Sequence, residues 1–192
     1  SSTLLTTQWP SVDESLGGGL TSSLHEIFSV ELYDSHSTAQ GLWSPSIDIA
    51  AHFARQGQQA NVAKSWVAWI GRRCFPYPSF LAGAQDQSLD LFDRSFFIDA
   101  GTPANRLWAI EQTIHSSVVG VVVADGSRFN MAATRRIQLR AQAHHTFVFL
   151  LRPNSELSEL SAAQTRWLVS YEPPNSIAQP PFVNPRWRLT LL

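Results

Sequence analysis

Short apolar runs alternate with amphipathic stretches along the middle of the chain. Residues 66–70, 95–98, 118–123 and 146–151 are apolar runs of strand length. The run at 118–123 is β-branched and has no polar alternation, which is typical of a strand that is covered on both faces. Strands of this kind, separated by helical segments, predict an α/β fold with a mostly parallel central sheet.

Three stretches around these runs carry a helical pattern. We expect a first helix over about 47–55, followed by a loop at 56–61. The second helix begins at Thr102, whose hydroxyl can cap the helix ahead of Pro103 at its first position. The third is capped by Asn130 and has apolar residues repeating every four positions.

The pattern changes towards the C-terminus. Residues 161–172 and 186–192 alternate between apolar and polar side chains, and the proline-rich stretch 173–185 joins them. Because alternation of period two predicts strands with one buried face, we expect these segments to form an antiparallel pair at one edge of the sheet. Residues 1–23 are an N-terminal arm with a glycine-rich turn, and 1–192 is expected to be a single domain.

Composition favours a protein that binds other proteins. Charged residues make up only 15% of the chain, and there are seven tryptophans. This combination indicates apolar surface beyond what the core requires. The formal net charge of −1 argues against tight binding of DNA by this chain alone. The single cysteine excludes an internal disulfide framework, and no apolar run is long enough to span a membrane, so we expect a cytoplasmic protein.

The glycine-rich turn and the apolar strand expected at 24–28 resemble the approach to the phosphate-binding loop of a RecA-type ATPase. In such an enzyme the strand is followed by G-x-x-x-x-G-K-[ST], whose backbone N–H groups and lysine hold the phosphates. This chain instead has SVELYDSHST at 29–38, with two acids and neither a glycine pair nor a lysine. We therefore predict a hydrolase-like scaffold that has lost its nucleotide chemistry and acts by binding.

Other candidates for chemistry have structural interpretations. Asp125 follows the central strand, where phosphate-loop enzymes keep a metal-binding aspartate, but turn and cap residues also occur there. Cys74 follows two arginines that could lower its pKa, yet the sequence places no general base beside it, so we expect a structural role. His144 and His145 lack the cysteines or carboxylates of a tetrahedral metal site and suit a helix C-terminus. We predict no catalytic residue, no cofactor and no metal.

Two groups of basic residues are candidate contacts for a partner: Arg135, Arg136 and Arg140 in the third helix, and Arg186, Trp187 and Arg188 in the tail. Arg136 and Arg140 are one helical turn apart, so they share a face. Arginine and tryptophan dominate interface hot spots, and the tail group could also stack on single-stranded nucleic acid. The alternatives are a solvated helix face and a structural strand with Trp187 turned inward.

Several segments, in order and over nearly the whole chain, resemble the ImuA family of bacterial proteins. ImuA proteins resemble RecA and the SulA division inhibitors, and they accompany an error-prone polymerase in SOS mutagenesis. The two most specific segments are LWAIEQ at 107–112 and RRIQLRAQ at 135–142. Further matching segments lie at 16–28, 69–77, 149–153, 165–167 and 185–187.

The resemblance implies a RecA-like three-layer fold and a non-catalytic adaptor in SOS-induced translesion DNA synthesis. Its expected partner is an ImuB-like inactive relative of Y-family polymerases, in an assembly with a C-family error-prone polymerase at the nucleoid. Weak DNA contact and self-association are further expectations, and no membrane is involved. Three alternatives stay open: a SulA-like inhibitor that binds FtsZ, a recombinase-like DNA-binding protein, and an ATPase with an unorthodox loop. The chain departs from the family at 29–46, which is longer and more polar.

Overall fold

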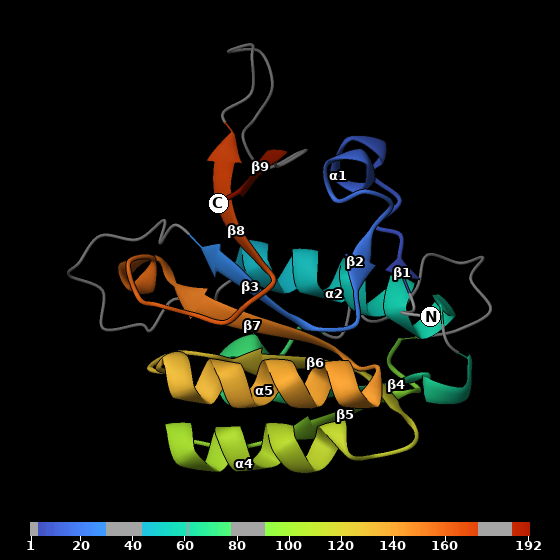
Figure 1. Cartoon of the computed structure of the whole chain (residues 1–192), viewed down its shortest axis with the longest axis vertical. Coiled ribbons are helices and arrows are strands. Elements are labelled where there is room, and N and C mark those ends of the chain that lie inside the picture. The colour runs from blue at the N-terminus through green and yellow to red at the C-terminus, as the bar shows by residue number, and fades with distance from the viewer. Residues whose placement is uncertain (1–3, 30–43, 61, 78–90, 173–185) are drawn as a thin grey trace.

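A seven-stranded sheet forms the centre of the protein. The computed structural model describes residues 4–29, 44–60, 62–77, 91–172 and 186–192. The strands of the sheet are β3 (Leu24–Ser29), β4 (Trp66–Ile70), β5 (Ser95–Ile98), β6 (Val119–Asp125), β7 (Phe147–Pro153), β8 (Thr165–Glu172) and β9 (Arg186–Leu191). Their order is β5-β4-β6-β7-β3-β8-β9 (Figure 1). Neighbouring strands are parallel except β8 and β9, so the mostly parallel sheet with an antiparallel C-terminal edge pair is confirmed.

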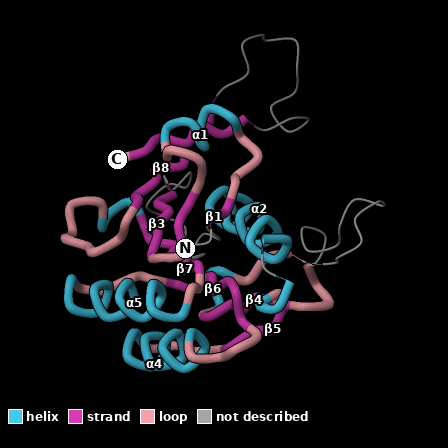
Figure 2. The backbone as a smooth tube through the Cα atoms, turned by 45° about the vertical axis from the view of Figure 1, so that its right-hand side comes forward, coloured by secondary structure: helices cyan, strands magenta, loops and turns pink. Residues whose placement is uncertain are grey.

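Helices cover both faces of this sheet. α2 (Ser44–Ala60) packs on one face, and α4 (Pro103–Ile114) and α5 (Met131–His144) pack on the other (Figure 2). Side chains of β6 alternate accordingly: Val121 and Val123 join the cluster under α2, whereas Val122 and Ala124 join the cluster under α4 and α5. The prediction of a central strand covered on both faces is confirmed.

The N-terminal arm folds onto the α2 side of the sheet. It contains the short pair β1 (Leu4–Leu5) and β2 (Leu20–Thr21), with α1 (Pro10–Ser15) between them. Gly19 has a φ of +134°, and a Cβ at this position would collide with the carbonyl oxygen of Leu5. The glycine-rich turn therefore serves the close approach of β2 to β1. Within the described part of the chain, none of the helices has the length and apolarity that a membrane crossing requires.

The helix caps follow the sequence signals. The Thr102 side chain accepts a hydrogen bond from the backbone N–H of Asn105, and Pro103 occupies the first turn of α4. The Asn130 side chain accepts from the backbone N–H of Ala133 at 3.0 Å. His145 ends α5 in a left-handed conformation, as a C-cap residue.

Two predicted boundaries are wrong. The loop expected at 56–61 is helical as far as Ala60, and residue 61 lies outside the described residues. Gly57 does not break the helix because it lies against Val121, where a Cβ would clash, so it lets α2 approach the sheet closely. The strand expected from 161 begins only at Thr165. The predictions for 30–43 and 173–185 fall outside the described residues.

A buried ion-pair network ties the middle of the sheet together. Arg152 at the end of β7 donates to Glu26 in β3 at 2.7 Å, and both side chains are completely buried. Arg166 in β8 donates to the second oxygen of Glu26 at 3.0 Å. Arg152 also binds Glu156 of the short turn η3 (Asn154–Glu156) and the carbonyl oxygen of Phe129. Three neighbouring strands and two connections thus depend on one carboxylate and one guanidinium.

We predict that Glu26→Gln lowers the free energy of unfolding by about 3–5 kcal/mol, because the buried Arg152 loses its charge partner. Urea unfolding followed by circular dichroism measures this change. The matched control is Glu172→Gln, which removes a pair between Glu172 and Arg188 that is largely open to solvent. Its expected effect is below about 1 kcal/mol. Equal losses in the two variants would contradict the role given to Glu26.

His25, also in β3, makes the stability of the fold depend on pH. Its Nε2–H donates to the backbone oxygen of Thr21 at 2.9 Å, so its Nδ1 accepts from the Thr165 hydroxyl at 2.8 Å. Burial lowers the pKa of His25 to about 4. In the unfolded chain an imidazole titrates near pH ~6.5. Protons therefore bind the unfolded chain preferentially between these two values, and stability falls as the pH falls through that window.

From about pH 6.5 to about pH 4.5, His25 should remove about 2 kcal/mol of stability. We expect His25→Gln to show a shallower loss over the same range, because glutamine does not titrate. Urea unfolding of both proteins at several pH values gives the comparison, and all other titrating groups cancel in the difference. Curves that stay parallel through this window would exclude His25 as the source.

Candidate functional site

The arginines predicted on the third helix lie on α5, and two of them reach across to α4. Arg136 Nη2 is 2.8 Å from Glu111 Oε2, and Arg140 Nε is 3.4 Å from Glu111 Oε1. Arg135 donates to Gln138 on its own helix at 2.5 Å. These arginines are therefore part of a surface that two helices build together, rather than an isolated basic stripe.

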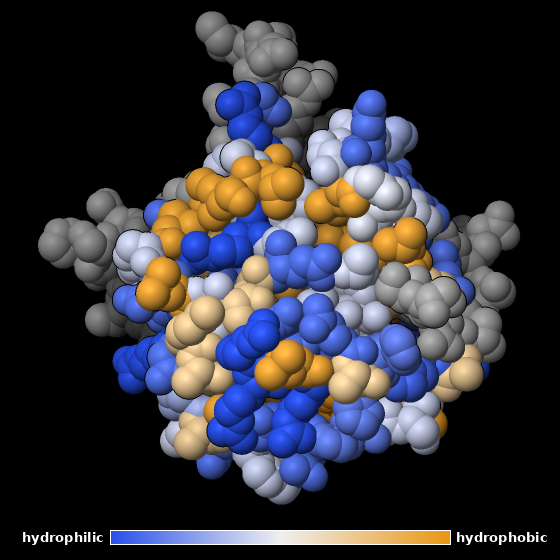
Figure 3. All heavy atoms as spheres, viewed as in Figure 1, coloured by the Kyte–Doolittle hydropathy of each residue, from blue (hydrophilic) through white to orange (hydrophobic). Residues whose placement is uncertain are grey.

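We call this region the α4–α5 surface and define it by Trp108, Glu111, Arg135, Arg136, Leu139 and Arg140. Trp108 lies one turn before Glu111 on α4, and 65% of its area is exposed. Leu139 lies between the arginines on α5 and is also exposed. In Figure 3, strongly hydrophilic side chains surround a hydrophobic one on the face above α5. Exposed apolar groups ringed by arginines are typical of a protein-binding surface.

The tail group Arg186, Trp187 and Arg188 lies in β9 at the edge of the sheet. Trp187 is partly buried against the core cluster on the α2 side. Arg188 is exposed and donates to Glu172 at 2.9 Å. The inward alternative for Trp187 therefore fits better than an exposed stacking platform. Figures 1 and 2 place β9 and α5 well apart, so the two predicted groups do not form one surface.

A crevice lies at the carboxyl ends of β4, β5 and β6. The connection from β4 to β5 carries Cys74 and Leu91, which pack on the α2 side, whereas β6 leads into α5 on the opposite side. Connections that leave adjacent strands in opposite directions open a crevice between them, which is where α/β proteins bind ligands. The cavity here has a volume of about 480 Å³.

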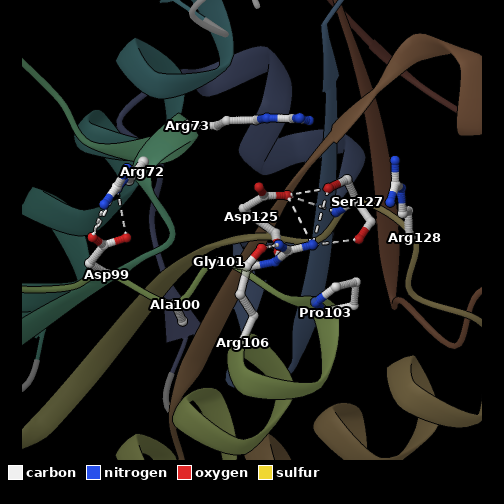
Figure 4. Close-up of a pocket in the computed structure, with 10 residues that line it drawn as sticks. All are labelled: Arg72, Arg73, Asp99, Ala100, Gly101, Pro103, Arg106, Asp125, Ser127 and Arg128. Atoms are coloured by element: carbon white, nitrogen blue, oxygen red, sulfur yellow. Dashed lines mark hydrogen bonds and ion pairs between the residues drawn. The ribbon is translucent and has the colours of Figure 1, made fainter.

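Charged side chains from three strand ends and α4 line this strand-end crevice (Figure 4): Arg72, Arg73, Asp99, Arg106, Asp125 and Arg128. Arg72 follows β4 and holds Asp99, which follows β5, through hydrogen bonds of 2.8 and 2.5 Å. Both side chains remain half or more exposed, so this pair forms the rim of the crevice.

The floor of the crevice is a fixed arrangement around Arg106. Its guanidinium is buried and donates to the carbonyl oxygens of Asp125, Gly101 and Ser127 at 2.8–3.0 Å. Burial lowers the pKa of Arg106, and the nearby Asp125 carboxylate opposes this shift. Oδ1 of Asp125 accepts from the backbone N–H and the hydroxyl of Ser127. Asp125 thus forms a turn, which was the structural alternative for it, and lies 3.7 Å from Arg106.

The remaining candidates for chemistry are structural. Cys74 is fully buried, and its Sγ donates to the carbonyl oxygens of Ile70 and Gly71. Burial raises the pKa of the Cys74 thiol, which fits the structural role expected for this residue. Among the residues with described positions, no group of three histidine, cysteine or acidic side chains is arranged to hold a metal ion.

Sequence reasoning singled out Asp125 but did not join it with the other charged residues of the crevice, Arg72, Asp99, Arg106 and Arg128. The signal that could have joined them is the position of polar residues directly after predicted parallel strands. Trp108 was likewise passed over as a helix residue.

In comparisons with known proteins, no family model matches this chain, and no curated protein matches it either.

We predict that Gly71→Ala disturbs the crevice and lowers the free energy of unfolding by about 1–3 kcal/mol. Gly71 has a φ of +95°, and a Cβ there would lie 2.9 Å from Cβ of Asp125 and 3.1 Å from Cδ of Arg106. Gly101→Ala is the matched control, because a Cβ at Gly101 meets nothing within 4 Å. Urea unfolding compares the two. A loss in Gly101→Ala as large as that in Gly71→Ala would contradict this packing.

Proposed function

We propose that this chain is a non-catalytic adaptor of the ImuA type in SOS-induced translesion DNA synthesis. In this proposal it binds an ImuB-like inactive relative of Y-family polymerases, within a cytoplasmic, nucleoid-associated assembly that contains a C-family error-prone polymerase. The finer form of the fold is also a proposal: the parallel sheet between α2 and the α4–α5 pair, with an antiparallel edge, is compatible with a RecA-like domain.

One observation carries the proposal. The two most specific segments of the ImuA resemblance, at 107–112 and 135–142, lie side by side on α4 and α5. Glu111 in the first segment is the ion-pair partner of Arg136 and Arg140 in the second. Segments separated in sequence but joined on one exposed surface suggest that this surface has a shared task. That task is proposed to be partner binding.

The composition of the α4–α5 surface suits a partner protein. Trp108 and Leu139 offer exposed apolar area, and Arg135 and Arg136 offer donors. Tryptophan and arginine contribute most of the binding energy in many interfaces when they become desolvated. Arg136 is already oriented by Glu111, so less conformational entropy is lost when a partner binds it.

Two features support the proposal that the protein is not a catalyst. Residues 29–38 lack the glycine pair and lysine that a phosphate-binding loop needs. At the end of β6, the carboxylate of Asp125 accepts two hydrogen bonds from Ser127 and faces the guanidinium of Arg106. A metal ion at this carboxylate would have to compete with a fixed positive charge.

The test is affinity purification of the tagged protein from its own cells after DNA damage, with mass spectrometry of what it retains. We expect recovery of a Y-family polymerase relative. Trp108→Ala should weaken the purified complex about 30-fold, because removal of a hot-spot tryptophan costs about 2 kcal/mol. Isothermal titration calorimetry with the recovered partner measures this loss.

A matched pair of leucines provides the control. Leu139 on the α4–α5 surface and Leu4 in β1 are exposed to 49% and 50%, and they lie on opposite sides of the sheet. Leu139→Ala should weaken the complex, and Leu4→Ala should leave it unchanged. Recovery of FtsZ without any polymerase would replace the proposal by the SulA-like alternative. Equal effects of the two leucine variants would remove the α4–α5 surface from it.

A further inference from the structure

We propose that the strand-end crevice binds a phosphate group, either of a free nucleotide or of a DNA strand, without hydrolysing it. This site is distinct from the α4–α5 surface and from the position after β3 where a phosphate-binding loop would lie. The inference does not require the adaptor role, because it rests only on the residues that line the crevice.

The charge balance of the crevice favours an anion. Four arginines and two aspartates line it, which gives a net charge of +2. Asp99 is held by Arg72 at the rim, and Asp125 is nearly buried and engaged by Ser127. Both carboxylates are therefore already engaged by donors, and the excess charge of the lining is carried by guanidinium groups. Arginine's planar fork of donors suits the several oxygens of a phosphate.

Arg128 is the residue most available to such a ligand. Among the described residues its guanidinium has no hydrogen-bond or ion-pair partner, while its backbone N–H donates to Glu156 at 2.9 Å. Its φ of +65° is uncommon for a residue with a side chain and is strained. Strained backbone at a strand end is often retained where it directs a side chain into a site. Here it places Arg128 on the wall of the crevice (Figure 4).

The shape of the crevice indicates which part of a nucleotide is recognised. Its volume of about 480 Å³ is in the range of small-molecule sites. Among the described residues its uncharged lining is Ala100, Gly101, Pro103 and Ser127, and these offer no aromatic ring on which a base could stack. Pro103 begins α4, whose helix dipole adds positive potential at this end. The site is therefore built to bind phosphate and to leave the base unread.

Isothermal titration calorimetry with inorganic pyrophosphate, in the absence of metal, tests the site. We expect the intact protein to bind, and Arg128→Gln to weaken binding about tenfold through loss of a charge-assisted hydrogen bond. Arg72→Gln, at the rim, should also weaken it. Arg94→Gln is the control, because this substitution removes the same charge at the amino end of β5, whereas the crevice lies at the carboxyl ends of the strands. Absence of pyrophosphate binding, or an equal loss in Arg94→Gln, overturns the proposal.

Competition experiments separate the two sources of phosphate. Displacement of pyrophosphate by ATP and dTTP with similar strength, but not by oligo(dT), assigns the site to free nucleotides. Displacement by oligo(dT) at lower concentration than by either nucleotide assigns it to DNA. Either result supports a phosphate site that does not read the base. A strong preference for one base, or displacement by an oligoglutamate peptide alone, contradicts it. Failure here leaves polymerase recovery by the α4–α5 surface unaffected.

Discussion

The buried pair of Glu26 and Arg152 is the interaction on which the rest of the structure depends. It joins β3 to β7, and Arg166 extends it to β8, so the N-terminal, central and C-terminal parts of the chain meet at one carboxylate. Both arginines also lie over the ring of Phe28, at 5.8 and 4.9 Å from its centroid. A fully buried charge requires several partners to offset the loss of water. The network therefore favours a single register for these strands, since a shift of one residue would leave a charge unpaired.

Much of the fold could be predicted from the sequence because its signals are local. The β-branched run before Asp125 indicated a covered strand, and Thr102 and Asn130 indicated helix starts by their own hydrogen-bonding chemistry. The predicted end of α2 was wrong because a glycine such as Gly57 can either break a helix or permit close packing. Only the proximity of Val121, a residue far away in sequence, decides between them.

The candidate sites were less predictable because they depend on pairing across elements. Helical spacing placed Arg136 and Arg140 on one face, but the contribution of α4 through Glu111 follows from how two helices pack. Trp187 was equally compatible with solvent and core until β9 was placed beside β8. The strand-end crevice could not be predicted without the order of the strands, since Arg72 and Arg128 line one cavity only because β4 and β6 are neighbours.

Helix α4 belongs to both surfaces of the protein. Pro103 borders the crevice, and Trp108 follows it by about 7.5 Å along the helix axis, at 1.5 Å per residue. A protein that covered both Trp108 and the first turn of α4 would also cover the mouth of the crevice. Whatever occupied the crevice would then have one wall supplied by this chain and a roof supplied by the other molecule. The two binding events would be coupled by shared geometry, without any change in the shape of the domain.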